Sequence, residues 1–194
     1  MSTIGEVKRV KTGGGEYFAF LSGLLRNPRA VSSPTPSSAV LAKAIALKVD
    51  PHWPGTLVEL GAGTGAITQA LIDRGFAPGR ILAIEYEPVL AQAVRRRCPG
   101  VRVFCDDAFQ FRTLAPEPIC AVVSGLPILH FPQAQRQALL RQALSSSAQR
   151  ILVQLSYSFR PPIKPPSQGI SVTGEMVWRN FPPAHVWTYR QRGN

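Results

Sequence analysis

Three glycines at alternate positions, Gly61, Gly63 and Gly65, follow a short apolar run that carries Glu59, and Glu85 comes about twenty residues later. Glycine is needed where a turn demands backbone angles that side chains resist, and where a bulky ligand must lie almost against the backbone. A carboxylate at the position of Glu85 is placed to bind the hydroxyls of a ribose. The spacing therefore predicts a site for a ligand that contains a nucleoside.

The glycine pattern alone leaves two ligands open, because Gly61, Gly63 and Ala66 also satisfy the dinucleotide pattern G-x-G-x-x-G/A. Glu59 stands two residues before the first glycine, where a carboxylate repels a pyrophosphate but suits a ligand with an ammonium and a sulfonium. We therefore predict S-adenosylmethionine as the cofactor and S-adenosylhomocysteine as its product. The run E-L-G-A-G-T-G also resembles motif I of the class I methyltransferases. A glycine turn with a purely structural role is the remaining alternative.

Segments that alternate between β and α patterns must position these residues, since period-two and period-3.6 apolar patterns predict strands and helices. The predicted strands are 56–60, 81–85, 101–104, 119–124, 150–157, 170–179 and 184–190. The predicted helices are 16–27, a segment capped by Ser37 or Ser38 that runs to Val49, 65–74, 88–97 and 132–145.

The fold class that follows is α/β: a Rossmann-like class I methyltransferase with a mostly parallel seven-stranded sheet, an antiparallel C-terminal hairpin and N-terminal helices. We assign residues 51–194 to the methyltransferase domain. Residues 1–50 form a predicted N-terminal helical extension that serves as a lid or as a membrane contact.

The carboxyl ends of the parallel strands define the candidate site, because ligands of such sheets lie across those ends. Asp107 and Ala108 are placed for an adenine amine and ring, although Asp106 and Asp107 could equally cap a helix. The predicted cofactor-binding residues are Glu59, Gly61, Ala62, Gly63, Thr64, Gly65, Glu85, Tyr86, Asp106, Asp107, Ala108, Ser124, Gly125 and Leu126.

Methyl transfer from a sulfonium asks little acid–base work of a protein, because positioning the nucleophile in line with the methyl supplies most of the rate. An alkylammonium acceptor, with a pKa near ~10 by analogy with lysine, must also lose a proton. We predict Tyr17 and Tyr157 as the residues that orient or deprotonate the amine, with Ser124 beside them. At Ser124-Gly125-Leu126 the amine could also meet backbone carbonyls. No catalytic triad or metal cluster competes, and no metal is predicted.

The composition favours an acidic partner. The 194 residues carry a formal charge of +11 from 22 Lys+Arg against 11 Asp+Glu. Such a surplus suits nucleic acid or anionic lipid, although it could also be a merely arginine-rich composition. The helix at 16–27 has an aromatic, apolar face with basic flanks, which is typical of an interfacial helix or of a helix that covers the core. The three cysteines form no C-x-x-C pair, so we expect reduced thiols in the cytosol.

Beyond the glycine turn, S-G-L-P stands where amino-group methyltransferases of DNA and ribosomal RNA carry Asn-Leu-Pro-Tyr or Asn-Pro-Pro-Tyr. Ser124 replaces the asparagine and Ile128 the aromatic residue, which disfavours a planar base. Nearly the whole chain instead resembles the bacterial phospholipid N-methyltransferases that act on phosphatidylethanolamine. The resemblance lies in E-L-G-A-G-T-G, A-I-E-Y-E-P, S-G-L-P, Q-L-S-Y before R-P-P, and V-W-R-N-F-P-P-A.

The resemblance implies up to three methylations of the lipid amine, toward phosphatidylcholine. It implies a cytoplasmic enzyme that is peripheral on the inner face of the bacterial membrane, with an anionic surface and a phospholipid as partners and no nucleic acid. A headgroup phosphate calls for a guanidinium, so Arg179 and then Arg160 are predicted to bind substrate, together with Ser38 and Leu126. Two alternatives stay open: an rRNA adenine dimethyltransferase-like enzyme, and a cofactor-binding module without catalysis that tethers a partner to the membrane.

Overall fold

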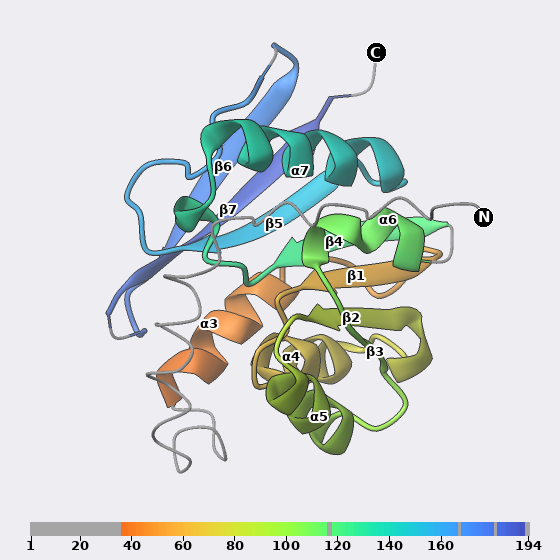
Figure 1. Ribbon diagram of the computed structural model, residues 1–194. Helices are drawn as coiled ribbons and strands as arrows, with labels where there is room; N and C mark the ends of the chain where they lie inside the picture. The colour runs from red at the N-terminus through yellow and green to blue at the C-terminus, as the bar shows by residue number, and fades with distance from the viewer. Residues whose placement is uncertain (1–35, 116–117, 167, 181, 193–194) are drawn as a thin grey trace, which may run out of the picture.

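The computed structural model describes residues 36–115, 118–166, 168–180 and 182–192 (Figure 1). The predicted helix at 16–27 lies outside the described residues, and so does Tyr17. Among the residues that are described, no helix is long and apolar enough to span a bilayer. The assignment of residues 1–50 to a separate extension stays a prediction.

The described residues form one seven-stranded sheet in the order β3-β2-β1-β4-β5-β7-β6. The five strands β1 to β5 pair in parallel, and β7 lies antiparallel between β5 and β6. The strands are β1 Thr56–Leu60, β2 Ile81–Glu85, β3 Arg102–Cys105, β4 Ile119–Ser124, β5 Ile151–Ser156, β6 Ile170–Val177 and β7 Ala184–Gln191. The predicted mostly parallel sheet with an antiparallel C-terminal hairpin is confirmed.

Helices cover both faces of this sheet (Figure 1). The helices α3 Pro36–Ala46, α4 Ala66–Arg74 and α5 Pro88–Arg97 pack on one face, and α6 Phe111–Leu114 and α7 Gln133–Ser146 pack on the other. Successive strand side chains point to opposite faces. Strand residues such as Leu57 and Val58 are therefore buried in different clusters on the two faces, which gives the protein two core layers.

The ends of the helices follow from local sequence. Gly75 adopts φ 114° after α4, and its N–H bonds back to Leu71 and Ile72, as a C-terminal cap requires. Pro88 supplies the first residue of α5. The predicted N-cap at Ser37 or Ser38 is wrong, because α3 already begins at Pro36. Proline suits that first turn, where its missing N–H costs no helical bond.

Short helical turns at the strand ends were not predicted, namely η1 Pro78–Arg80, η2 Ala108–Gln110, η3 Ile128–His130 and α6. Within η1, Arg80 organises the segment that leads into β1. Its guanidinium donates to the carbonyls of Pro51 at 2.7 Å, Gly55 at 3.0 Å and Trp53. One charged side chain thereby satisfies three backbone acceptors and fixes where β1 begins.

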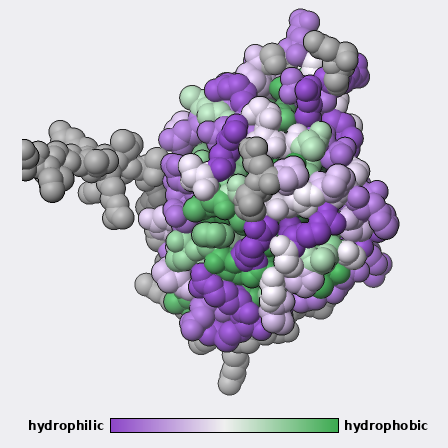
Figure 2. Space-filling model, turned by 90° about the vertical axis from the view of Figure 1, so that its right-hand side faces the viewer, coloured by the Kyte–Doolittle hydropathy of each residue, from purple (hydrophilic) through white to green (hydrophobic). Residues whose placement is uncertain are grey.

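The surface away from the carboxyl ends of the parallel strands is mixed in hydropathy. Figure 2 shows the side that faces right in Figure 1, where hydrophilic residues cover most of the area and hydrophobic residues gather in a smaller part of it.

Candidate functional site

The glycine turn between β1 and α4 adopts the left-handed backbone that its sequence predicts. Gly61, Gly63 and Gly65 have φ of 71°, 56° and 79°. A Cβ on Gly61 would lie 2.9 Å from Leu126 Cδ2, whereas a Cβ on Gly63 would meet no atom within 4 Å among the described residues. Gly61 is therefore required by the protein's own packing. The open space at Gly63 fits a ligand that approaches the backbone.

Glu59 is fully buried at the end of β1, beneath this turn. Its Oε2 accepts a hydrogen bond from Thr68 Oγ1 at 2.7 Å, while Oε1 has no partner among the described residues. Burial raises the pKa of Glu59 to about 8, the bond from Thr68 lowers it in part, and the nearby carboxylate of Glu85 raises it. A buried carboxyl with an unused oxygen is well suited to a cationic ligand, which would favour its ionised form.

Glu85 ends β2 and holds the turn in place. Its Oε2 accepts from Gly63 N–H at 2.7 Å and its Oε1 from Glu87 N–H at 3.0 Å. Burial raises the pKa of Glu85, and the backbone N–H groups of Glu87, Gly63 and Tyr86 lower it in part. Glu85, which is predicted to bind the ribose, therefore also holds the glycine turn in its shape. Since each carboxylate oxygen has two lone pairs, these bonds leave room for ribose hydroxyls.

The residues after β3 favour the helix-cap alternative. Asp107 Oδ1 accepts from Phe109 N–H at 2.9 Å and caps η2, and Asp106 Oδ1 accepts from Asp107 N–H at 2.7 Å. Asp106 also donates its N–H to the carbonyl of Glu85 at 3.2 Å. The structure therefore brings this loop to the end of β2, with Ala108 buried behind it. Adenine contacts by Asp106, Asp107 and Ala108 stay a prediction.

The loop after β4 packs directly on the glycine turn. Gly125 donates to the carbonyl of Leu60 at 2.8 Å, and a Cβ on Gly125 would lie 2.8 Å from Gly61 O. Ser124 is buried, and its Oγ accepts from Leu126 N–H at 3.4 Å. The predicted residues Ser124, Gly125 and Leu126 thus stand beside the predicted cofactor residues of β1.

The carbonyl of Leu126 is not open to an acceptor amine, contrary to the prediction for this atom. It already accepts hydrogen bonds from Ile128 N–H at 2.7 Å and from Gln154 Nε2 at 2.9 Å. A carbonyl oxygen has two lone pairs, so both are engaged. A contact between the Leu126 side chain and substrate stays a prediction.

Gln154 is a candidate that the sequence interpretation missed. It lies fully buried in β5 directly beside Ser124, its Nε2 also donates to the carbonyl of Leu155 at 2.7 Å, and its Oε1 has no partner among the described residues. A buried amide with an unused acceptor is unusual and costly. The available signal was one polar residue inside the apolar run I-L-V-Q-L.

The predicted substrate residues lie at the same edge of the sheet. Tyr157 follows β5 and is exposed, and Arg160 and Arg179 are exposed as well. The pairing of Ser156 with His185 places the turn that holds Arg179 at the carboxyl end of β5. Ser38 lies in the first turn of α3, and its side chain is outside the described part of the chain.

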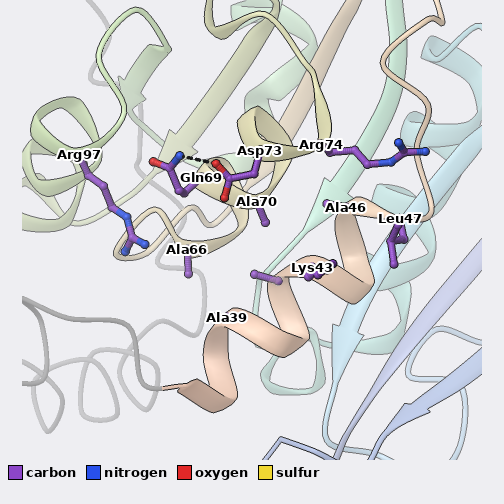
Figure 3. A pocket seen from close by; sticks show the side chains of 11 residues that line it. Ala39, Lys43, Ala46, Leu47, Ala66, Gln69, Ala70, Asp73, Arg74 and Arg97 are labelled. Carbon is purple, nitrogen blue, oxygen red and sulfur yellow. Dashed lines mark hydrogen bonds between the residues drawn. The ribbon is translucent and has the colours of Figure 1, made fainter.

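A pocket of about 390 Å³ lies between α3 and α4 (Figure 3). Its lining includes Lys43, Gln69, Asp73 and Arg97, and the Gln69 amide donates to Asp73 at 2.9 Å. None of the predicted residues lines it. No group of three or more His, Cys, Asp or Glu among the described residues could hold a metal ion.

Comparison with known proteins assigns a class to this arrangement. A family described as "Methyltransferase domain" matches residues 57–148. An ornithine lipid N-methyltransferase of Singulisphaera acidiphila is 31% identical over 133 residues, which cover 65% of this chain and 69% of that protein.

Solved structures agree on the fold. Magnesium protoporphyrin IX methyltransferase (ChlM) of Synechocystis PCC 6803, with bound S-adenosylmethionine, superposes with a TM-score of 0.69 at 12% identity, over 96% of this chain and 100% of that chain. TrmN of Thermus thermophilus superposes with a TM-score of 0.60 at 18% identity, over 79% of this chain and 49% of that chain.

The chain belongs to the class I S-adenosylmethionine-dependent methyltransferases. Its cofactor is S-adenosylmethionine, as the sequence predicts. Within this class, the similarity to an ornithine lipid N-methyltransferase supports N-methylation of a lipid.

Proposed function

We propose that this protein methylates the primary amine of a membrane amino lipid, and that phosphatidylethanolamine is the acceptor, with up to three transfers toward phosphatidylcholine. The observation that carries lipid N-methylation is the 31% identity with an ornithine lipid N-methyltransferase. Phosphatidylethanolamine as the acceptor rests on S-G-L-P and W-R-N-F-P-P-A in the sequence. The proposed place of action is the anionic inner surface of the membrane.

Ornithine lipid is the second candidate acceptor, because it is the lipid named for that relative. Both headgroups carry an amine close to an anion, a phosphate in one and a carboxylate in the other. A guanidinium binds either anion through two parallel hydrogen bonds. Arg179 and Arg160, which are exposed at the strand ends, therefore suit both lipids.

The cofactor, when bound, supplies an electrophilic methyl group on a sulfonium. The chain's contribution is to hold the partners in line, which is where most of the rate of such a reaction arises. Glu85 and the backbone of Gly63 set the shape of the turn that would receive the nucleoside. Glu59 provides a buried carboxyl on the side where a positive charge is expected.

The acceptor amine must present a free lone pair, so the ammonium form has to lose a proton first. Tyr157 stands exposed after β5, from where its hydroxyl can orient the amine and pass a proton to water. Buried Ser124 supports the loop below it through the hydrogen bond from Leu126 N–H. Tyr17 keeps its predicted role in orienting the amine.

The test is transfer of a labelled methyl group to vesicles that contain phosphatidylethanolamine, to vesicles that contain ornithine lipid, and to a short adenine-containing RNA. We expect label in the mono- and dimethyl forms of phosphatidylethanolamine and in phosphatidylcholine. Label in ornithine lipid alone would transfer the proposal to that lipid. Label in RNA alone would favour the rRNA adenine dimethyltransferase-like alternative, and cofactor binding without any transfer would favour a non-catalytic module.

A further inference from the structure

The end of β5 and the turn between β6 and β7 form one edge of the protein. Ser156 pairs with His185 and Val177 pairs with Ala184, so the residues just after β5 lie beside those of the hairpin turn. Because β5 is parallel to β4 and β1, this edge is also the one at which the glycine turn and the S-G-L-P loop emerge. Whatever this edge contacts is close to the catalytic site.

Large aromatic side chains are exposed along this edge. Phe159 is 74% exposed, Trp178 is 73% exposed and Tyr157 is 54% exposed. Phe159 and Trp178 are the most exposed large hydrophobic residues in the described part of the chain. We call Tyr157, Phe159 and Trp178, with Arg160 and Arg179, the aromatic rim.

The rim has a rigid support. The ring of Phe159 meets His185 edge-on at 5.5 Å, and His185 stacks on buried Trp187 at 5.1 Å. A Cβ on Gly174 of β6 would lie 2.5 Å from the Trp187 ring, so glycine there leaves the space that the indole fills. A continuous stack of rings therefore joins exposed Phe159 to the core, which holds the ring outward at a fixed place.

The charge of this region complements an anionic surface. Arg160, Lys164 and Arg179 are exposed, and the one acid in residues 156–192, Glu175, is paired with Lys48. Aromatic rings that sit at the headgroup level, together with basic residues, are the usual composition of an interfacial contact. Each basic side chain close to an anionic leaflet adds to the attraction.

We propose that the aromatic rim is a membrane-docking surface. Phe159 and Trp178 enter the headgroup region of an anionic leaflet, Arg160 and Arg179 contact the lipid phosphates, and the carboxyl ends of the strands face the bilayer. This inference rests on the proposed lipid substrate. It assigns a membrane contact to the folded domain, independent of the N-terminal helix that the sequence predicts for this purpose.

The experiment uses the full chain and vesicles of phosphatidylethanolamine with or without phosphatidylglycerol. Trp178 is its own reporter, because lipids brominated near the headgroup quench a tryptophan that enters the leaflet. We expect quenching in the parent protein, loss of most of it in Trp178→Phe, and retained vesicle binding in that variant. Absence of quenching, or quenching that persists unchanged in Trp178→Phe, would overturn the proposal.

A second measurement is sedimentation with the same vesicles. Phe159→Ser combined with Trp178→Ser should weaken partitioning to anionic vesicles by about tenfold or more, because two apolar anchors are lost. The matched control is Val89→Ser, which removes an exposed apolar side chain of α5 far from the rim and should leave binding unchanged. Equal vesicle binding by the double variant and the control would refute membrane docking by the aromatic rim. If the double variant instead changes only from dimer to monomer, the rim would be a contact surface for a second copy of the chain.

Turnover separates this inference from the proposed function. In detergent micelles that present the amino lipid without a bilayer, the double variant should keep its rate within about twofold, since neither residue is placed in the catalytic site. A parent protein that binds vesicles through the rim but methylates no lipid in micelles would contradict the proposed function and leave the rim standing. If the parent protein methylates the lipid in micelles and the double variant binds vesicles as well as the parent does, the rim would be refuted and the proposed function would stand.

Discussion

Replacing Glu59 with glutamine tests the electrostatics of the site most directly. Glu59 is fully buried and its pKa is raised from 4.5 to about 8, chiefly by burial. The folded protein therefore holds this proton more tightly than the unfolded chain does. The corresponding stability is fully present below about pH 4.5 and is lost as the pH rises to about 8. Glutamine has the same shape, can still accept from Thr68 Oγ1, and never ionises.

The magnitude follows from the two pKa values. A difference of this size corresponds to about 5 kcal/mol in the free energy of unfolding, at ~1.4 kcal/mol per pKa unit. Without cofactor, parent and Glu59→Gln should therefore be similarly stable at pH 4.5, and the variant should be the more stable by several kcal/mol at pH 8. Two groups close by, Glu85 and Cys98, interact electrostatically with Glu59, so Glu59→Gln also removes the part of their interaction that depends on the charge of Glu59.

The assay is urea unfolding of both proteins at intervals between pH 4.5 and pH 8.5. Calorimetric titration with S-adenosylhomocysteine in two buffers of different ionisation enthalpy forms the second arm. The ammonium of S-adenosylhomocysteine should favour the ionised form of Glu59. Binding near pH 7 should therefore release up to about one proton in the parent and none in Glu59→Gln. A stability difference that does not change with pH, or identical proton release in both proteins, would refute the reasoning.

Three further predictions test the site and its support. Gly63→Ala should abolish binding of S-adenosylhomocysteine but lower the free energy of unfolding by only about 1–2 kcal/mol, because its Cβ enters open space and only the φ angle is strained. Gly61→Ala should lower the free energy of unfolding further, because its Cβ would also meet Leu126. Equal affinity of Gly63→Ala and the parent for S-adenosylhomocysteine would exclude Gly63 from the cofactor site. Arg80→Ala should lower the free energy of unfolding, measured in urea, by about 2–4 kcal/mol, because it leaves three backbone carbonyls without their donor. The control is Arg141→Ala on the exposed side of α7, which should stay near the parent value. Arg179→Lys keeps the positive charge but loses the planar guanidinium that can make two parallel hydrogen bonds to an anion. The kcat/KM for lipid should therefore fall about tenfold while the affinity for the cofactor stays unchanged. Unchanged lipid kinetics would remove Arg179 from the site.

Much of the fold could be predicted because burial on both faces makes the strands uniformly apolar. The predicted strands at 81–85 and 119–124 coincide with β2 and β4, and the predicted helix at 88–97 coincides with α5. Proline and glycine mark the ends of such elements through local backbone geometry alone. The short turns η2, η3 and α6 were missed, since one helical turn carries no periodic pattern.

The candidate site could be predicted as a set of strand ends but not as a set of contacts. The occupied carbonyl of Leu126 depends on Gln154, 28 positions away, and the role of Arg80 depends on carbonyls up to 29 positions away. These partners meet only after the sheet has formed. Likewise, burial raises the pKa of Glu59, and that burial follows from the packing of α4 on β1 rather than from the neighbours of Glu59 in sequence.

The position of β7 has a consequence for the synthesis of the chain. Of the strands that the structure describes, β7 is made after the other six, yet it is the one that joins β6 to β5, and Gln191 follows Ser156 by 35 positions. A ribosome adds these residues in roughly 2–7 s. During that time β5 presents an uncharged, apolar edge, I-L-V-Q-L-S, with no strand beside it. The nascent protein is therefore exposed to aggregation at this edge until β7 pairs with it, and protection of that single edge should raise the yield of active enzyme.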